Sequence, residues 1–119
     1  MTSEQVGHYR ELSAKYLRLA WALLAEGDPM EALERGWAAV ASELEVAAKA
    51  RSLPHDRHWE LWVVVRALIE ESGDIDLGVL FGCVQSMQIN FYDVQYEAEE
   101  VEWFLDEVER LVEKLEALA

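Results

Sequence analysis

Cysteine, proline and glycine are all scarce in this 119-residue chain, and each scarcity narrows the choice of fold. A single cysteine excludes an intramolecular disulfide and a cysteine-based zinc site. Six glycines and two prolines are too few turn residues for a protein of many strands. No apolar run reaches the roughly 18 residues of a membrane span, and the first residues lack the pattern of a signal peptide. We therefore expect a cytoplasmic protein that does not associate with membranes.

Basic residues are also scarce, and the charge is unevenly distributed. The chain holds 10 Lys and Arg against 24 Asp and Glu, which gives a net charge of −14. So acidic a protein is a poor candidate for binding duplex DNA, because that binding relies on a basic surface. Residues 1–66 have a net charge of −2 and residues 67–119 a net charge of −12. The acids of the second part are interpreted as a solvated helix face, and any anion would have to bind to the first part.

The apolar residues, which make up 52% of the chain, recur at helical spacing. Intervals of three and four residues predict helices over about 3–26, 29–53, 56–71, 76–93 and 97–118. Short connections make sequential helices antiparallel neighbours. We therefore expect an all-α, up-and-down bundle of four to five helices, formed by residues 1–119 as a single domain.

Helix-capping residues mark the predicted boundaries. Ser3 is suited to the start of the first helix, and Gly27 to a left-handed conformation at its end. Asp28-Pro29 is typical of a helix start, since aspartate caps and proline fits the first turn. Gly73 predicts the end of the third helix. The apolar run Leu61–Val65 predicts that this third helix is the most buried one.

Hairpin geometry then predicts a site. Counting outward from the turns at Gly27 and Gly73 places the start of the third helix beside the end of the fourth, and the end of the second beside the start of the first. One end of the bundle would then gather every histidine and the single asparagine. The residues predicted to meet there are His8, Lys49, Arg51, His55, Arg57, His58, Gln88, Asn90 and Tyr92.

Five of these residues are predicted to bind a nucleotide, an RNA end or another anion: Arg57, His58, Gln88, Asn90 and Tyr92. His58 with Arg51 or Arg57 forms the candidate catalytic set, because imidazole titrates near neutral pH. A structural interpretation stays open for each of them. Polar residues gather at helix ends because these ends are exposed to water. His58 could donate a hydrogen bond to a nearby carbonyl, and Asn90 could cap a helix.

Enzyme motifs are largely absent. The Glu-x-x-His pattern of di-iron bundles does not occur, nor does a glycine-rich phosphate loop or a GxSxG nucleophile. Glu31-x-x-Glu34 and Glu71-x-x-Asp74 match the carboxylate pairs that hold Mg²⁺ in helical nucleotide pyrophosphatases. Gly73 would break the second pair, and such matches arise by chance in an acidic chain. We therefore expect neither a metal nor a cofactor.

Three segments of the sequence resemble a known family. Ala25-Glu26-Gly27-Asp28 followed by Glu34-Arg35-Gly36-Trp37-Ala38-Ala39 resembles the second-helix signature of the PaREP family (type one), which comprises small helical proteins common in heat-loving archaea. His58-Trp59-Glu60-Leu61-Trp62 is similar to the His-x-x-Leu-Trp of that family. Leu80-Phe81 with Asn90-Phe91-Tyr92 is similar to its Leu-Phe and Asn-Phe-Tyr segment. The resemblance runs from about residue 20 to the C-terminus.

That family in turn resembles the HEPN class, which implies an up-and-down helical bundle, often a homodimer, and in many members an RNase of a toxin–antitoxin system. Active members carry Arg-x4–6-His near the last core helix. Arg51 and His58 fit that spacing, but they lie between the second and third helices with Pro54 between them. Gln88 stands where the family usually has a histidine. Both departures argue against a competent RNase.

The expected function is therefore that of a non-enzymatic, HEPN-like interaction protein associated with a nucleotide or RNA, in a context like that of a toxin–antitoxin pair. A metal-independent HEPN-type endoribonuclease is the alternative, and a Mg²⁺-dependent nucleotide pyrophosphatase is a third. The expected partners are a second copy of the chain, which would pack through the Trp-rich or Ala-rich surface of the second and third helices, and a protein, RNA or nucleotide.

Overall fold

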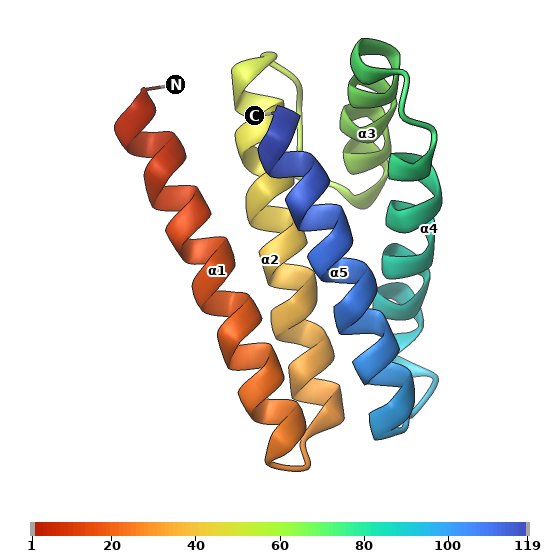
Figure 1. The fold of residues 1–119 in the computed structure, drawn as a ribbon. Helices are drawn as coiled ribbons and strands as arrows, with labels where there is room; N and C mark the ends of the chain where they lie inside the picture. The colour runs from red at the N-terminus through yellow and green to blue at the C-terminus, as the bar shows by residue number, and fades with distance from the viewer. Residues whose placement is uncertain (1, 119) are drawn as a thin grey trace.

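In a computed structural model, which describes residues 2–118, every regular element of that part of the chain is helical (Figure 1). The elements are α1 (Ser3–Ala25), α2 (Pro29–Ala50), α3 (His58–Ser72), α4 (Asp76–Ile89), the short 3-10 helix η1 (Asn90–Tyr92) and α5 (Ala98–Leu118). The predicted all-α bundle is confirmed. None of the helices in residues 2–118 combines the length and the apolar character that a bilayer crossing requires.

The contacts between helices give their directions. Trp21 of α1 donates a hydrogen bond to Glu109 of α5 at 2.7 Å, and α1 runs antiparallel to both α2 and α5 (Figure 1). In contrast, α3 runs in the same direction as α2. Its first residue packs on Trp37 and its end lies beside Arg51, so that positions along the two helices increase together. The expectation that each helix is antiparallel to the next is therefore wrong between α2 and α3.

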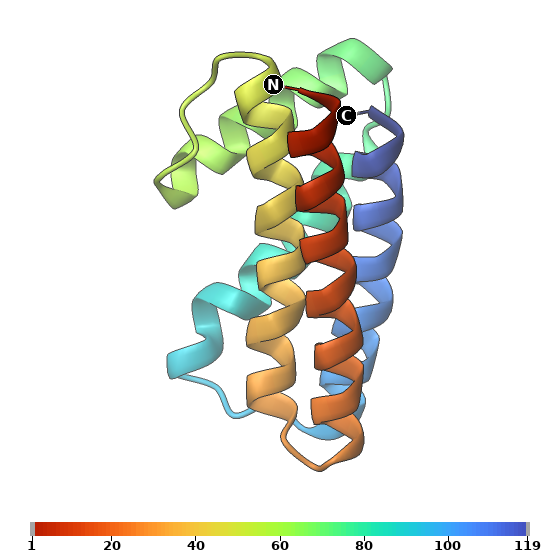
Figure 2. The ribbon, with the colours of Figure 1, turned by 90° about the vertical axis from the view of Figure 1, so that its left-hand side faces the viewer.

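The chain reverses direction at Ser52, directly after α2. The Leu53 N–H donates a hydrogen bond to the Ala48 carbonyl at 2.9 Å, and the Ser52 N–H donates one to the Lys49 carbonyl at 3.3 Å. This pair of hydrogen bonds is typical of a Schellman cap at the end of a helix. Ser52 has a φ of 54°, a left-handed conformation that usually calls for glycine. Because no glycine marks this reversal, the sequence did not reveal it. The chain then turns back toward the middle of the bundle, and α3 starts in the upper half of the view in Figure 2.

Most of the predicted helix boundaries agree with the structure. Gly27 and Gly73 have φ values of 87° and 73°, as their cap positions require. Asp28 accepts the backbone N–H of Glu31 at 3.2 Å and so caps α2. The start of α1 differs by one residue, since Thr2 rather than Ser3 provides the cap.

The end of the fourth helix and the most buried helix both differ from the predictions. The regular part of α4 ends at Ile89, and Asn90–Tyr92 form a tighter 3-10 turn. Within α3, Trp62 and Val63 are partly exposed. The most buried helix is α2, because it packs against α1, α5 and the α3–α4 hairpin. Its alanine-rich face, predicted to form a dimer interface, is buried within the chain.

The closest approach between two helices is at Gly36 of α2. A Cβ atom built on Gly36 would lie 2.7 Å from Leu105 Cδ2 and 2.9 Å from Phe104 Cε1, both on α5. Leu105 and Phe104 are fully buried, so neither side chain has space to retreat. Glycine at this position therefore sets the spacing of α2 and α5.

We predict that Gly36→Ala lowers the free energy of unfolding by about 1–3 kcal/mol, because the added methyl group overpacks the core. Gly7→Ala is the matched control, since Gly7 lies in α1 and a Cβ atom added there would meet nothing within 4 Å. That change is expected to raise stability by about 1 kcal/mol through helix propensity. Guanidinium denaturation measures both, and equal effects of the two changes would contradict the close approach.

A carboxyl group is buried between α1, α2 and α5. Glu43 is 1% exposed, and neither of its carboxylate oxygens has a hydrogen-bond partner among the described residues. Burial, and next the neighbouring carboxylate of Glu116, raise the pKa of Glu43 to about 7. Ser13 and Arg10 of α1 oppose that rise. Between about pH 4.5 and pH 7 the folded state therefore holds a proton on Glu43 that the unfolded chain releases.

The pKa of Glu43 predicts how stability depends on pH. A carboxyl group with a raised pKa in the folded state costs stability as pH rises from its ordinary value of 4.5 to about 7. We predict that Glu43→Gln removes this loss, so that at pH 8 its free energy of unfolding is about 3 kcal/mol higher than that of the unchanged protein, an order-of-magnitude figure from the pKa shift. Glu113→Gln, on the exposed side of α5, removes the same charge and should leave the pH profile unchanged. Denaturant unfolding between pH 4 and 8 measures both variants.

Candidate functional site

A cluster of polar side chains surrounds Glu45, in the second half of α2. Its Oε1 atom accepts a hydrogen bond from the Tyr9 hydroxyl at 3.2 Å and lies 3.1 Å from Lys49 Nζ. Lys49 also donates to the Tyr9 hydroxyl at 2.6 Å. His55 Nε2 is 3.7 Å from the same carboxylate oxygen. The Tyr9 hydroxyl, and next Glu45, raise the pKa of Lys49 above its ordinary value, so this ammonium group stays charged.

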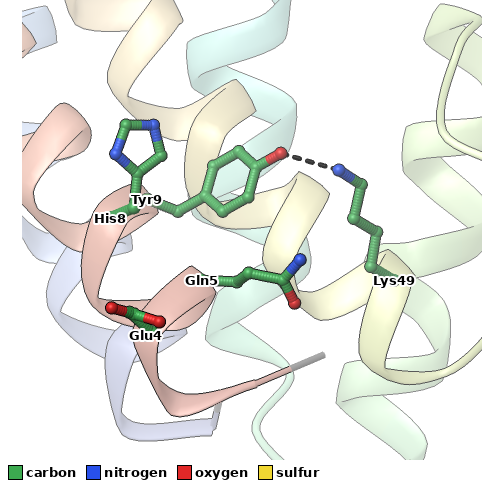
Figure 3. A pocket seen from close by; sticks show the side chains of 5 residues that line it. All are labelled: Glu4, Gln5, His8, Tyr9 and Lys49. Atoms are coloured by element: carbon green, nitrogen blue, oxygen red, sulfur yellow. Dashed lines mark hydrogen bonds between the residues drawn. The ribbon is translucent and has the colours of Figure 1, made fainter.

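On one side of this cluster lies a hollow of about 520 Å³ (Figure 3). It is lined by Glu4, Gln5, His8, Tyr9 and Lys49, and we call it the His8 hollow. The antiparallel α1–α2 hairpin brings the start of α1 level with the end of α2, as predicted. The His8 ring packs edge-on against Tyr9, with centroids 5.8 Å apart.

On the other side lies a smaller hollow of about 230 Å³, which we call the His58 hollow. Its lining residues come from α2 and from the chain that returns along it: Trp37, Ala41, Glu45, His55, Asp56, Arg57, His58 and Leu61. The His58 ring stacks on the Trp37 indole, with centroids 5.7 Å apart and planes 15° apart. The Arg57 backbone N–H bonds the Glu60 carboxylate at 3.0 Å, which fixes the start of α3. Two histidines, an arginine and a tryptophan therefore line one hollow.

Arg51 does not join this group. Its Nε and Nη2 atoms bond the two carboxylate oxygens of Glu71 at 2.8 and 2.7 Å, and Nη2 also contacts the Leu118 carbonyl at 3.3 Å. Glu71 is 13 residues along α3 from His58, a separation of about 20 Å at the helical rise. Of the two arginines predicted to act with His58, only Arg57 lies beside it.

The residues predicted from the fourth helix are also elsewhere. Gln88, Asn90 and Tyr92 line neither hollow, and Tyr92 is 84% exposed at the turn after α4. The Asn90 backbone carbonyl accepts the N–H groups of Asp93 and Val94, which ends the helix. Figure 2 shows that α3 and α4 diverge from their connecting turn like the two arms of a V. The start of α3 lies at the open end of one arm, and η1 lies at the open end of the other. The prediction that all nine residues share one end of the bundle is therefore wrong, although Gln85 of α4 does reach the start of α3, where it donates a hydrogen bond to the His58 carbonyl at 3.5 Å.

The width of the V has a steric cause. Near its closed end Gly78 approaches Ile69, since a Cβ on Gly78 would lie 3.2 Å from Ile69 Cδ1. Toward the open end, the large Trp62 indole lies between the helices, packs edge-on against Phe81 at 4.8 Å and donates a hydrogen bond to Gln85. The volume of the indole widens the spacing between α3 and α4. Counting residues outward from the turn gives positions along the two helices and cannot show this spacing.

The carboxylate pairs that match a pyrophosphatase do not converge. Glu31 bonds Arg35 at 2.7 Å in the first turn of α2, whereas Glu71 lies level with Arg51 at the far end of that helix. Twenty residues of helix separate the two levels by about 30 Å. Asp74 is itself bonded to Lys114 at 2.6 Å. Among the described residues, no group of three or more His, Cys, Asp or Glu side chains could hold a metal ion.

Three residues of the site are not predicted from the sequence. Trp37 and Tyr9 fall in the apolar stripes of their helices, a pattern that indicates core residues rather than site residues. Glu45 is one of many acidic residues and is not predicted as part of the site. Its spacing of four residues from Lys49 nevertheless predicts an ion pair on a helix face, and this spacing is the sequence feature that could have located the cluster.

Comparison with known proteins gives a family. No curated protein and no solved structure gives a significant match to this chain. One family model, described as the Archaeal PaREP1/PaREP8 family, matches residues 8–112, which include both hollows apart from the first residues of α1. The matched range also contains all three segments on which the resemblance to the PaREP family was based. The chain therefore belongs to the archaeal PaREP1/PaREP8 family.

Proposed function

We propose that the protein is a non-enzymatic binding protein that holds a phosphate-bearing ribonucleotide, free or at the end of an RNA, in the His58 hollow. One observation carries this proposal: Arg57, His55 and His58 line the same hollow as Trp37, at the N-terminus of α3. An arginine beside a helix N-terminus favours an anion, and an indole–imidazole stack provides an aromatic surface for a base.

The charges around the hollow are mixed, and Arg57 is the cation that could bind an anion. Glu45 contributes a negative charge to the hollow, but Lys49 and His55 both lie within 4 Å of its carboxylate. Asp56 is the other acid of the lining. Arg57 makes no ion pair with another residue in 2–118, so its guanidinium is available for a phosphate.

The dimensions support a small ligand. The His58 hollow, at about 230 Å³, accepts the phosphate or the ribose of such a ligand, and the rest of the nucleotide extends beyond the hollow. The His8 hollow lies beyond the Glu45–Lys49 pair and offers about 520 Å³ more. A mononucleotide or a single-stranded end can extend from one hollow toward the other, whereas a duplex cannot.

The arrangement favours binding over cleavage. Arg51, which with His58 fits the Arg-x4–6-His spacing of HEPN ribonucleases, is bonded to Glu71, which lies about 20 Å along α3 from His58. A metal-independent ribonuclease would have to use Arg57 and the two imidazoles instead. That is the second candidate function, and the presence of His55 and His58 in one hollow is the observation that favours it.

Isothermal titration with inorganic phosphate, adenosine monophosphate and a short single-stranded RNA tests the binding proposal. We predict that Arg57→Ala weakens binding of the phosphate-bearing ligands by about 10- to 100-fold, the loss of one charge-assisted hydrogen-bonding group. Arg66→Ala is the matched control, because Arg66 is exposed on the same helix outside the hollow. Equal losses in both variants, or no binding by the unchanged protein, would refute the proposal.

Incubation of labelled RNA with the protein in EDTA separates the two functions. We expect the RNA to remain intact while it is bound. Cleavage that persists in EDTA and disappears in His58→Ala would establish the ribonuclease instead, and cleavage that His58→Ala leaves unchanged would indicate a contaminating enzyme.

A further inference from the structure

Two further hollows lie where α4 and α5 pack side by side (Figure 1). The first, of about 420 Å³, lies at the end of α4 and the start of α5, and we call it the Trp103 hollow. Its lining residues are Met87, Tyr96, Glu99, Glu100 and Trp103. The second, of about 540 Å³, shares Met87 and Trp103 with the first and continues along α4 as far as Gly78. Because the hollows share two lining residues, they form one groove, which we call the α4–α5 groove.

The start of α5 places aromatic and acidic side chains on one side. Tyr96, Glu99, Glu100 and Trp103 occupy positions i, i+3, i+4 and i+7, which lie on one helical face. The Glu100 carboxylate accepts the backbone N–H of Glu97 at 2.9 Å, which fixes this first turn. Trp103 is 49% exposed, although burial of an indole would normally contribute to the core. About half of this large aromatic surface is therefore available to a ligand.

The charge around the Trp103 hollow is of one sign. Residues 93–109 contain eight acids and no Lys, Arg or His. In the described part of the chain, neither Glu99 nor Glu100 pairs with a basic side chain. Arg110 and Lys114, the next bases along the sequence, are paired with aspartates at or just before the start of α4. The carboxylates of the hollow are therefore available to a cation from outside.

The walls of the Trp103 hollow suit one kind of side chain. An indole attracts a cation to the face of its ring, and a carboxylate makes charge-assisted hydrogen bonds with an ammonium or guanidinium group. The thioether of Met87 and the ring of Tyr96 provide apolar contacts for the aliphatic stem that carries such a group. The hollow therefore fits the side chain of a lysine or an arginine.

The α4 part of the groove requires apolar neighbours for that side chain. Residues 77–92 contain no Asp, Glu, Lys or Arg, and Val79 on this side of α4 is 57% exposed. From Gly78 to Met87 the groove follows α4 for about 14 Å, between two and three helical turns. A free ammonium ion would leave this length uncovered. A helix with apolar side chains on one face and a basic residue at one end would cover it.

We propose that the α4–α5 groove binds a basic amphipathic helix of a partner protein. One lysine or arginine of that helix enters the Trp103 hollow between the indole and Glu99, and its apolar side chains lie along α4 beside Val79. An amphipathic helix in an apolar groove is a recurrent mode of recognition. Here the acidic end of the groove also sets the direction in which the helix binds.

Local charge separates this partner from other occupants of the groove. A second copy of the chain has a net charge of −14 and would face the eight acids of residues 93–109. RNA and anionic lipid surfaces are repelled from this groove in the same way. An uncharged helix would cover α4 but would partly desolvate Glu99 and Glu100 without offering them a partner. A basic amphipathic helix matches both parts of the groove.

Fluorescence anisotropy of a labelled synthetic peptide tests the groove. The probe is an amphipathic helical peptide with leucines on one face and lysines at one end, used at about 0.15 M salt so that long-range attraction is screened. We expect the unchanged protein to bind it, Trp103→Leu to weaken binding about 5-fold, and Glu99→Gln to weaken it about 3- to 5-fold. The matched controls, expected to leave binding unchanged, are Trp59→Leu on α3 and Glu113→Gln, since Glu113 is exposed about 20 Å along α5 from Glu99.

Equal losses in Glu99→Gln and Glu113→Gln would show that the peptide responds to net charge alone, and would overturn the proposal. No binding by the unchanged protein would overturn it as well. Circular dichroism checks that each variant keeps its helical content.

Changes to the peptide test the same groove without depending on how a variant folds. We expect at least about 10-fold weaker binding when glutamine replaces each lysine or serine replaces each leucine. A glutamine peptide that binds as tightly as the original would show that the groove does not select a cation. Displacement of the original peptide by an equal concentration of n-butylammonium would show a site for small cations instead. Either result would contradict a basic helix as the occupant.

Sedimentation equilibrium of the protein alone tests for a second copy in the groove. We expect Trp103→Leu and the unchanged protein to have the same assembly state. A loss of assembly in Trp103→Leu that does not occur in Trp59→Leu would identify a second copy as the occupant and overturn the proposal.

Discussion

The close contact between α2 and α5 is the constraint on which the rest of the structure depends. At Gly36 the two helices approach so closely that Leu105 and Phe104 occupy the space of a side chain. Because α2 is held this way against α5 and also packs against α1, it becomes the buried axis of the bundle. The hairpin of α3 and α4 then has only the remaining side of α2 and α5 to cover, and the His58 hollow forms where α3 meets α2.

The sequence predicts those parts of the fold that local chemistry determines. Helical periodicity and the caps at Gly27, Asp28 and Gly73 place most helix boundaries within two residues, because glycine and aspartate act on the adjacent backbone alone. The reversal at Ser52 was not predictable, since serine rarely adopts a left-handed conformation and only the packed structure stabilises it there. The direction of α3 depends on that reversal.

The candidate site was predictable only in part for the same reason. His8 and Lys49 come together because a tight glycine turn joins their helices, and counting along such a hairpin gives the correct level. Asn90 and Tyr92 are separated from His58 because the Trp62 indole is wedged between α3 and α4, and that depends on side-chain volume rather than on sequence spacing. Trp37 is not predictable as a site residue, because its place in an apolar stripe indicates the core and does not show that it also lines a surface hollow.

The return of the chain from Ser52 to Arg57 also affects local stability. Helix α3 carries a wall of the His58 hollow, yet it is held by few neighbours and by the Arg51–Glu71 pair at its far end. Helices with fewer packed neighbours open locally at a lower free energy, so we expect the amide hydrogens of α3 to exchange faster than those of α2 or α5. A ligand that contacts α3 in the hollow would oppose this local opening and slow the exchange along the helix.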